Sequence, residues 1–532
     1  MLKTLNHLTT FPLSPTTNLK KTTKHFIMSL KNDNFYKKDK KQLFNDKKTP
    51  FYKMNIYTNN PLATYTPSEN MPWNSMRVQH LYRRAGFGAT PEMIEAGLKI
   101  SPSELIDQLL EKVLNQEHMA DPGWGYLNYG ELIEKYGDTR TDIGLKKLEN
   151  NFFNLMLNNG LYARMLFFWH DHFATEEREV RIPSYTFQKY ILIQKNLLGN
   201  FKDFTYKIGL TPEMLMYLNG YSNTKNSPNE NYARELYELF TLGVNNGYTE
   251  KDTEETAKAL TGYNTTDSTW GNIIFNERSS FDNSDKTIFG ETGNWNYEDV
   301  INILFEKRKD EIATYICTKL YKYFIDDTIN LSTIEELSKI FIEHNFDIEI
   351  IVRTLLKSNI FFDKNSIGKL IKSPIDLIFQ LQTELSINLI NNNDESDETI
   401  QRLLKGLKIE LFTPPNVSGW PEHKQWITTN SVIDRNLTCY KILNNHKDLL
   451  MSFFKKHNVD EIDKSIKNTA NFLLATPLYF KEEYIPLIDS FKQGVPKEYF
   501  EDGTWDLEYH DLDQQVFNLL NAIQRLPEFQ LR

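Results

Sequence analysis

Helix signals dominate this sequence from about residue 77 onward and constrain its fold more than any other feature. Ser101-Pro102-Ser103-Glu104 has the pattern of a capping box with proline at the first helical position. The residues that follow repeat at the spacing of one buried helix face: Leu105, Ile106, Leu109, Leu110, Val113 and Leu114. The pattern predicts an amphipathic helix that packs against neighbouring helices.

The same signals recur along the chain. Thr90-Pro91 and Thr249–Asp252 resemble helix starts, and apolar residues have helical spacing within 297–325 and 335–361. Evidence for strands is thin, and Ile273-Ile274-Phe275 is the clearest extended stretch. We therefore expect a mainly α-helical fold with few or no strands and with long loops around 118–142, 263–296 and 412–432.

Charge divides the chain into a basic arm and an acidic body. Residues 1–53 hold 12 lysines, three aspartates and no arginine, so they carry +9, whereas the whole chain carries −10. Because the arm lacks apolar periodicity, we expect residues 1–60 to be disordered. Residues 61–532 are predicted to form a single large multi-helix domain, with a sub-boundary near 445–465 as the alternative. Nucleic acid is not an expected partner, because the acidic body repels phosphates.

The sequence also limits the compartments and covalent links that we expect. No stretch reaches the roughly 18 apolar residues of a membrane span, and the N-terminus lacks the apolar core of a secretory signal. A cytoplasmic protein without a transmembrane segment is therefore expected. Cys317 and Cys439 match no disulfide or zinc spacing, so we expect both to be small buried side chains.

The stretch NENYARELYELFTLGVNNGY, residues 229–248, mixes charged and bulky apolar residues. At about 100° per residue, Glu230, Arg234 and Glu238 share one arc with Tyr237, opposite an apolar arc. Arg234 is the i+4 neighbour of one carboxylate and the i−4 neighbour of the other, so it can bridge both. The pattern predicts a polar helix face that is a solvated stripe, a partner surface or the wall of a reactive cleft.

Glu235 is the exception on this helix. It projects between Leu239 and Leu242 at the edge of the apolar arc, where a carboxylate needs a partner or a raised pKa. Glu235 is therefore the best candidate for a catalytic acid or base, with Glu230, Arg234 and Glu238 beside it. The structural alternative is a buried ion pair or a cap that fixes two helices together.

His170 and His172 form a candidate metal site in the segment LYARMLFFWHDHFAT. Two residues of separation place them about 200° apart in a helix but on one side of an extended segment. Chelation of a divalent metal thus requires the helix to end near Trp169, with Asp171 among the oxygen ligands. The alternative is a helix C-terminus whose histidines complement the helix dipole.

Two further segments contain candidate binding residues. Arg83 and Arg84 precede a glycine turn and a helix start, where backbone N–H groups could hold an anion, although a simple helix stop explains the pattern equally well. Pro414–Pro421 forms a turn-rich loop that ends with Trp420 and either lines a sugar or peptide site or covers a core. The hydrolase elbow, the phosphate-binding loop and the H-E-x-x-H motif are all absent from the sequence.

Several motifs occur together in a characteristic order: HLYRRAGFGATPEMI, LFFWHDHFAT, NENYARELYELFTLGVNNGYTEKD, ALTGY, KTIFG, LLKSNIFF, IKSP, FTPPNVSGWP and LPEFQLR. Over about residues 77–532 the chain thereby resembles the uncharacterised bacterial domain of unknown function 1800 family. The resemblance implies a largely helical protein of unassigned activity, and a sulfatase-like partner protein, since many relatives are exported and encoded beside one. The motifs shared with the family contain these candidate functional positions: Arg83, Arg84, His170, His172, Asn229, Glu230, Arg234, Glu235, Glu238 and Trp420.

The sequence departs from the family pattern at two positions and at its start. Phe281-Asp282 stands where relatives have a His-Asp pair, and Tyr217-Leu218-Asn219 replaces a YLD-like element. The usual export signal is missing. If the replaced histidine and aspartate belong to a reactive centre, this member has an altered one.

Two hypotheses follow. The first is a helical scaffold or binding module, in which the charges lock helices together and Trp420 and Tyr263 belong to a partner or glycan surface. The second is a metal-assisted or acid/base hydrolase-like enzyme, in which His170 and His172 meet the 229–238 helix in a polar cleft. The positions of the two histidines distinguish these hypotheses.

Overall fold

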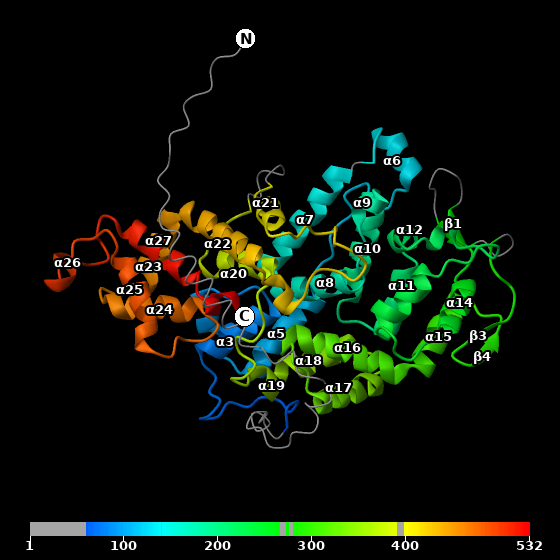
Figure 1. The fold of residues 1–532 in the computed structure, drawn as a ribbon, viewed down its shortest axis with the longest axis horizontal. Helices are drawn as coiled ribbons and strands as arrows, with labels where there is room; N and C mark the ends of the chain where they lie inside the picture. Colours follow the sequence, from blue (N-terminus) through cyan, green and yellow to red (C-terminus); the bar gives the residue numbers. More distant parts are fainter. Residues whose placement is uncertain (1–59, 140, 266–272, 276–279, 391–397) are drawn as a thin grey trace, which may run out of the picture. The chain divides into compact units, whose positions relative to one another are not determined.

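The computed structural model describes residues 60–139, 141–265, 273–275, 280–390 and 398–532, and it is mainly α-helical, as predicted (Figure 1). The strands of the described part pair into two small two-stranded sheets. Residues 1–59 of the predicted basic arm lie outside the described residues. Among the described helices, none has both the length and the apolar character needed to cross a membrane.

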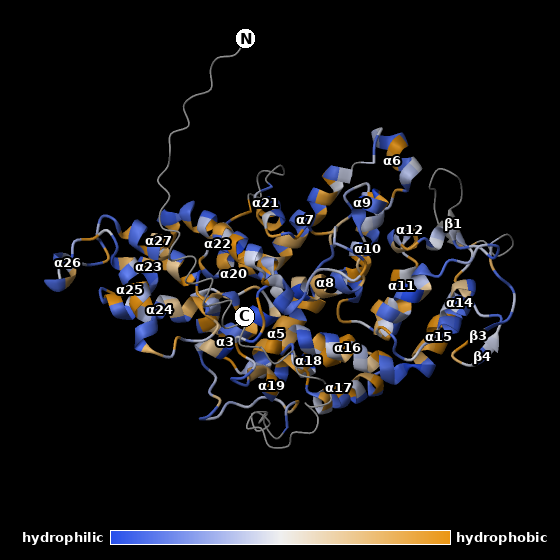
Figure 2. Ribbon diagram, viewed as in Figure 1, coloured by the Kyte–Doolittle hydropathy of each residue, from blue (hydrophilic) through white to orange (hydrophobic). Residues whose placement is uncertain are grey.

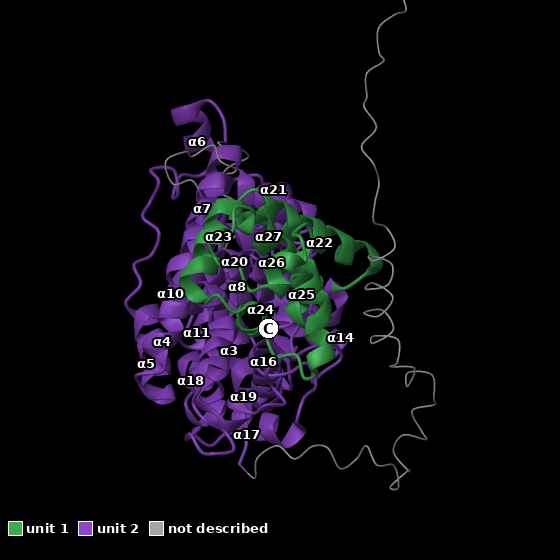
Figure 3. Ribbon diagram, turned by 90° about the vertical axis from the view of Figure 1, so that its left-hand side faces the viewer, with its two compact units in different colours: residues 1–56, 427–530 green, residues 57–426, 531–532 purple. Residues whose placement is uncertain are grey.

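The chain divides into two compact units (Figure 3). Of the described residues, the larger unit contains those up to 426 and the last two, 531–532, and the smaller contains 427–530. The division after Trp426 lies ahead of the sub-boundary expected near 445–465. A single domain over 61–532 stays a prediction.

Side-chain caps begin the first helices of the larger unit, as the sequence predicted. Ser101 accepts a hydrogen bond from the backbone N–H of Glu104 and Thr90 from that of Met93. The prediction that Leu114 belongs to the buried face of the helix that follows Ser101 is wrong, because its side chain is 58% exposed. These helices are α3 (Ser75–Ala85), α4 (Pro91–Gly97) and α5 (Pro102–Leu114).

A group of helices follows in which the long predicted loop 118–142 is interrupted. Asn128 and Glu131 form a reciprocal capping box that starts α6 inside that range. The helices are α6 (Tyr129–Tyr136), α7 (Thr141–Asn158), α8 (Gly160–His172), α9 (Glu177–Val180), α10 (Pro183–Asn196), α11 (Phe201–Gly209) and α12 (Pro212–Tyr217). Helix α8 packs against α3, α5, α7 and α10, and buries Trp169 completely.

The charged stretch 229–248 does not form one regular α-helix. After the 3-10 turn η2 (Gly220–Ser222), α13 (Asn231–Glu235) continues directly into the π-helix η3 (Leu236–Thr241). A π-turn has more residues per turn than an α-turn, so the angles assumed beyond Glu235 fail. Tyr237, predicted on the polar arc, is consequently buried.

Short strands lie within the predicted loop 263–296. The extended conformation predicted for Ile273–Phe275 is confirmed as β2, which pairs antiparallel with β1 (Tyr263–Thr265). β3 (Lys286–Ile288) pairs antiparallel with β4 (Glu291–Gly293) and contacts α14 (Glu250–Ala259). The helix start predicted at Thr249–Asp252 is confirmed, and Thr249 and Asp252 form a reciprocal capping box there.

The remaining helices of the larger unit add many further buried residues to its apolar core. The stretch 297–325 contains two helices separated at Arg308, and Cys317 on the second is buried, as expected. The 412–432 region contains one 3-10 turn and the start of the next unit. The helices are α15 (Tyr297–Lys307), α16 (Lys309–Phe324), α17 (Leu331–Glu343), α18 (Ile348–Lys357), α19 (Asn359–Phe362), α20 (Pro374–Glu384), α21 (Thr399–Gly406) and η4 (His423–Trp426).

The smaller unit is also helical. Its helix α27 packs against α22, α23, α24 and α25, with Phe454, Phe491 and Leu520 buried. Hydrophobic and hydrophilic residues alternate along its helices, as on those of the larger unit (Figure 2). The elements are α22 (Thr429–Asn444), α23 (Lys447–His457), α24 (Ile462–Leu473), η5 (Lys481–Tyr484), α25 (Ile485–Lys492), α26 (Glu498–Glu501), α27 (Leu512–Ile523) and η6 (Pro527–Gln530).

Candidate functional site

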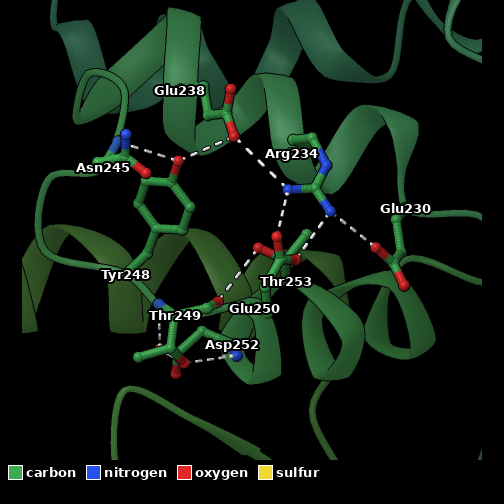
Figure 4. Close-up of polar contacts among 9 residues, drawn as sticks. All are labelled: Glu230, Arg234, Glu238, Asn245, Tyr248, Thr249, Glu250, Asp252 and Thr253. Atoms are coloured by element: carbon green, nitrogen blue, oxygen red, sulfur yellow. Dashed lines mark hydrogen bonds and ion pairs between the residues drawn. The ribbon is translucent and has the colours of Figure 1, made fainter.

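Arg234 is the centre of a carboxylate network on α13 (Figure 4). Its guanidinium lies 3.0 Å from Glu230 and 3.6 Å from Glu238, so the predicted bridge between the two is present. It also makes two hydrogen bonds, of 3.0 and 2.8 Å, to Glu250 at the start of α14. Because Glu250 lies 16 residues further along the chain, the sequence spacing did not reveal it. Arg234 thus connects two helices, and carboxylates of the chain itself surround its guanidinium.

Glu235 lies beside this network without joining it. Its carboxyl group is half-buried, and burial together with the nearby Glu238 raises its pKa, while Arg234 opposes the shift. Glu235 also contributes to the raised pKa of Tyr217. No hydrogen bond or ion pair reaches the Glu235 carboxylate from any residue described in the structure. A catalytic role for Glu235 stays a prediction.

His170 lies on α8 and faces the segment after α21. Helix α8 continues through His172, so the helix end near Trp169 that the metal hypothesis requires is not formed. The His170 Nε2 atom accepts the backbone N–H of Phe412 at 3.3 Å. Its ring packs against Phe412 and Trp420, with centroid separations of 4.8 and 5.5 Å. Burial holds the pKa of His170 well below its ordinary value, so the imidazole is neutral.

His172 faces a different set of neighbours. Lys319 on α16 donates to its Nδ1 at 3.1 Å, so the Nε2–H donates to the carbonyl oxygen of Phe240 at 3.0 Å. Burial, and then Lys319, lower the pKa of His172 far below its ordinary value. Within the described ranges, no group of three or more His, Cys, Asp and Glu side chains is placed to hold a metal ion. Metal binding at the two histidines stays a prediction.

Asp171 lies between the two histidines and connects α8 to the turn-rich loop. Its Oδ1 accepts the backbone N–H of Trp420 at 2.8 Å. Gly419 has a φ of +86°, and a Cβ at that position would overlap the Asp171 carboxylate, so this close approach requires glycine. Burial raises the pKa of Asp171 to about 7, although Lys319 and the Trp420 N–H oppose the shift.

Lys319 completes a group that we call the Asp171 cluster: Asp171, His172, Tyr315, Lys319 and Glu422. Burial lowers the pKa of Lys319, while the charges of Asp171 and Glu422 act in the opposite direction. Lys319 and Asp171 both remain partly exposed, and within the described chain no carboxylate forms an ion pair with Lys319. The cluster therefore contains an acid and a base that are close enough to influence each other but are not paired.

The sequence contained a signal for Lys319 that its apolar surroundings conceal. Lys319 follows Tyr315 by four residues and Ile316 by three, so it lies on the predicted core face of the 297–325 stretch. A lysine on such a face needs a partner or a lowered pKa. His172 supplies the partner from 147 residues away, which spacing alone does not reveal.

Arg83 and Arg84, the predicted anion-binding pair, are buried and hold the core together. Arg83 makes a bidentate ion pair with Glu384, at 2.7 and 3.0 Å. Arg84 donates to the carbonyl oxygens of Phe324 and Ile325 at 3.2 Å and of Ser366 at 2.7 Å. An anion would compete with these internal partners.

Trp420 and Asn229 are likewise engaged within the chain. Trp420 is 5% exposed and stacks on Phe167 at 5.5 Å, so its ring covers a core. Asn229 accepts the backbone N–H of Asn231 at 3.0 Å and donates its own backbone N–H to Asn223. Tyr263, expected at a partner surface, packs against Phe275 at 5.1 Å.

The two departures from the family pattern have structural explanations. Phe281 is buried against Phe275, and the ammonium of Lys286 lies 4.6 Å from its ring centroid. This cation–π contact needs the aromatic ring. Asn219 has a φ of 59°, a left-handed conformation that asparagine adopts more readily than most residues.

Comparison with known proteins places the chain in a family but does not assign an activity. No curated protein and no solved structure matches it significantly. A model of a family described as a protein of unknown function, DUF1800, matches residues 80–531. The motifs that form the Asp171 cluster and the Arg234 network lie within the match, and the chain belongs to the DUF1800 family.

Proposed function

We propose that the Asp171 cluster performs general acid–base chemistry of a hydrolase-like kind. The observation that supports this most strongly is the unpaired juxtaposition of Asp171 and Lys319. Both groups are enclosed by protein yet partly exposed, and their pKa values move toward neutrality from opposite sides. Acid–base catalysis is most efficient when the pKa values of the reacting groups lie near the working pH.

Each residue of the cluster has a distinct part in this proposal. Asp171 accepts a proton in its ionised form, while Lys319 donates one to a leaving group or stabilises developing negative charge. His172 is a positioning residue, because its neutral Nδ1 orients the Lys319 ammonium. The backbone N–H of Trp420 fixes one oxygen of Asp171 and leaves the other for a substrate.

Competitive acetylation over a range of pH tests the proposal without a known substrate. Lys319 should become reactive at lower pH than Lys309, an exposed lysine on the same helix, because burial lowers its pKa. Replacing Asp171 by asparagine should lower the titration midpoint of Lys319 further, since the carboxylate charge that supports the ammonium is removed. Equal midpoints for Lys319 and Lys309 would contradict the proposal.

A hydrolase screen with ester, amide, sulfate and glycoside substrates extends this test. For any substrate turned over, Lys319→Met and Asp171→Asn should each lower kcat by roughly a hundred-fold or more, whereas Lys309→Met should leave it unchanged. His172→Asn, which keeps an acceptor near the position of Nδ1, should lower it less than His172→Phe. Equal turnover by wild type and the Asp171→Asn variant would remove Asp171 from the mechanism.

A helical scaffold or binding module is the second candidate function, and specific observations favour it. The predicted charged positions Arg83 and Arg234 lock helices together, and His170 and His172 face different neighbours. In this alternative the Asp171 cluster recognises a ligand without transforming it. The sulfatase-like partner protein stays a prediction of the family resemblance, and co-purification with that protein would test it.

A further inference from the structure

A second site lies in the larger unit, on the surface formed by α7, α9 and the segment around 405–413. It is a pocket with a volume of about 1090 Å³. Pockets for small organic ligands typically measure about 300–1,000 Å³, so this one accommodates an extended ligand. Its walls include Tyr129, Glu149, Glu177, Arg181 and Met216. None of the residues of the Asp171 cluster lines it.

Acidic side chains predominate in this pocket. Six carboxylates and four basic groups line it. The basic groups are mostly engaged: Arg178 pairs with Glu410 at 2.6 Å, Lys405 pairs with the same carboxylate at 3.4 Å, and Lys146 pairs with Glu398. The pocket therefore has an excess of negative charge whenever all its carboxyl groups are ionised.

Glu177 provides independent evidence for a missing ligand. The residue is 1% exposed, yet its Oε1 atom has no hydrogen-bond partner among the described residues. Its backbone N–H donates to the carbonyl oxygen of Phe412 at 3.0 Å, which fixes its position in the pocket wall. An enclosed carboxylate oxygen without a donor is costly, and a donor from a ligand in the pocket would remove that cost.

We propose that this pocket binds an organic cation that carries two or more amino groups, with Glu177 and Glu149 as its principal partners. Ammonium groups match both features of the pocket, because each supplies hydrogen-bond donors and a positive charge. Spacing between the amino groups allows one to reach the enclosed Glu177 while another meets Glu149 on α7. A polyamine-like chain has this composition.

The titration of the two carboxyl groups supports the choice of a cation and predicts how binding depends on pH. Burial raises the pKa of Glu149 to about 7, and burial together with the charge of Glu213 raises that of Glu177 to about 7. Aliphatic amines remain protonated up to about pH 10. Binding of the cation should therefore strengthen as the pH rises through 7 and the carboxyl groups lose their protons.

Calorimetric titration of the full chain with spermidine, at roughly 0.15 M salt, tests the proposal. Spermidine should bind at pH 8, and its affinity should fall roughly ten-fold or more at pH 6, because each carboxyl group changes from mostly ionised to mostly protonated. Putrescine should bind more weakly, and 1,4-butanediol, its uncharged analogue, should not bind. Spermidine that fails to bind wild-type protein at pH 8 would overturn the proposal.

Variants locate the binding. Glu177→Gln and Glu149→Gln should each weaken spermidine binding roughly ten-fold, since each removes one charge-assisted hydrogen bond. Glu336→Gln, at an exposed position of α17, should leave the affinity within two-fold of wild type. Equal affinity for wild type and both pocket variants would show that spermidine binds elsewhere and would contradict the proposal. Because Asp171 is absent from the pocket, Asp171→Asn should leave spermidine binding unchanged even if it abolishes turnover.

Discussion

Asp376 and Asp171 are both surrounded by protein, yet their carboxyl groups titrate in opposite directions. Burial alone would raise the pKa of Asp376, but Arg164 at 2.7 Å and Arg532 at 3.4 Å hold it at about 2. Asp171 has one backbone N–H from Trp420 and a more distant ammonium, and its pKa is about 7. The difference shows that the number and closeness of charged partners, more than burial itself, decide the state of each group.

This contrast separates a structural charge from a reactive one. The Oδ2 atom of Asp376 also accepts the backbone N–H and hydroxyl of Ser373, while Oδ1 forms the ion pair with Arg164, so both oxygens are held by the chain. Asp171 has only one oxygen held by the chain and can exchange a proton near neutral pH. Asp376 therefore stabilises the fold, whereas Asp171 has the freedom that acid–base chemistry requires.

The largest effect that tests this comparison is expected from Asp376→Ala. The substitution leaves the guanidinium groups of Arg164 and Arg532 buried without their carboxylate and removes the side-chain half of the capping box that Asp376 supplies to Ser373 at the start of α20. We expect a loss of about 3–5 kcal/mol in the free energy of unfolding, measured by urea denaturation. Asp376→Asn, which retains acceptor oxygen and shape, should lose less. A loss below about 1 kcal/mol for Asp376→Ala would show that the pairs contribute little.

Asp171→Asn should raise the free energy of unfolding, in contrast to Asp376→Ala. Because the folded-state pKa of Asp171 lies above its ordinary value, the ionised carboxyl group destabilises the fold above about pH 7. The variant should be more stable than wild type by about 1–2 kcal/mol at pH 8. This value is lower than the full shift implies, because the side chain is partly exposed and asparagine accepts the Trp420 N–H less strongly.

The pH dependence of these two substitutions completes the test. The gain from Asp171→Asn should shrink as the pH falls from 7 toward 4 and disappear below about pH 4, where wild-type Asp171 becomes protonated in both states. The stabilisation by Asp376 should instead persist to about pH 4 and decline toward pH 2, since its folded-state pKa is lowered. Parallel pH profiles for the two substitutions would contradict the comparison.

Local structure was largely predictable from the sequence, because its causes lie within a few residues. The caps at Thr90, Ser101 and Thr249 and the bridge from Arg234 to Glu230 and Glu238 all depend on spacings of three or four residues. Strand Ile273–Phe275 followed from its own apolar residues. These interactions need no information about the tertiary fold.

The site was less predictable, because its contacts join distant segments. The sequence predicted that His170 and His172 lie in one polar cleft with the 229–238 helix. Among the described residues, His172 bonds to the carbonyl group of Phe240, just beyond that stretch, whereas His170 bonds to Phe412. The π-helix changed the directions of the side chains after Glu235. Pairing of Lys319 with His172 depends on how α16 packs, which no local pattern specifies.

Arg234 is paired with carboxylates, like Asp376 with its arginines, but it is partly exposed. Arg234→Met should therefore change the free energy of unfolding less than the substitutions of Asp376 and Asp171. Its guanidinium is 34% exposed and has three carboxylate partners, so solvent screens each ion pair. We expect a loss of about 0.5–1 kcal/mol in the free energy of unfolding at low salt. The loss should decrease at about 1 M sodium chloride, where screening acts within about 3 Å. A loss that is independent of salt would point to the packing of the arginine stem.

The smallest effect is expected from Glu235→Gln, and it decides how far the comparison extends. Glu235 resembles Asp171 in having a pKa raised by burial without an ion pair, but it is only half-buried. Its ionised form therefore destabilises the fold weakly, and the variant should gain at most about 0.5 kcal/mol at pH 8 and nothing at pH 4. If the Asp171 cluster is the reactive centre, turnover of any substrate found should be unchanged in Glu235→Gln and lost in Asp171→Asn. If turnover is instead lost in Glu235→Gln and unchanged in Asp171→Asn, Glu235 is the catalytic residue, as the sequence predicted. The raised pKa of Asp171 would then reflect burial alone.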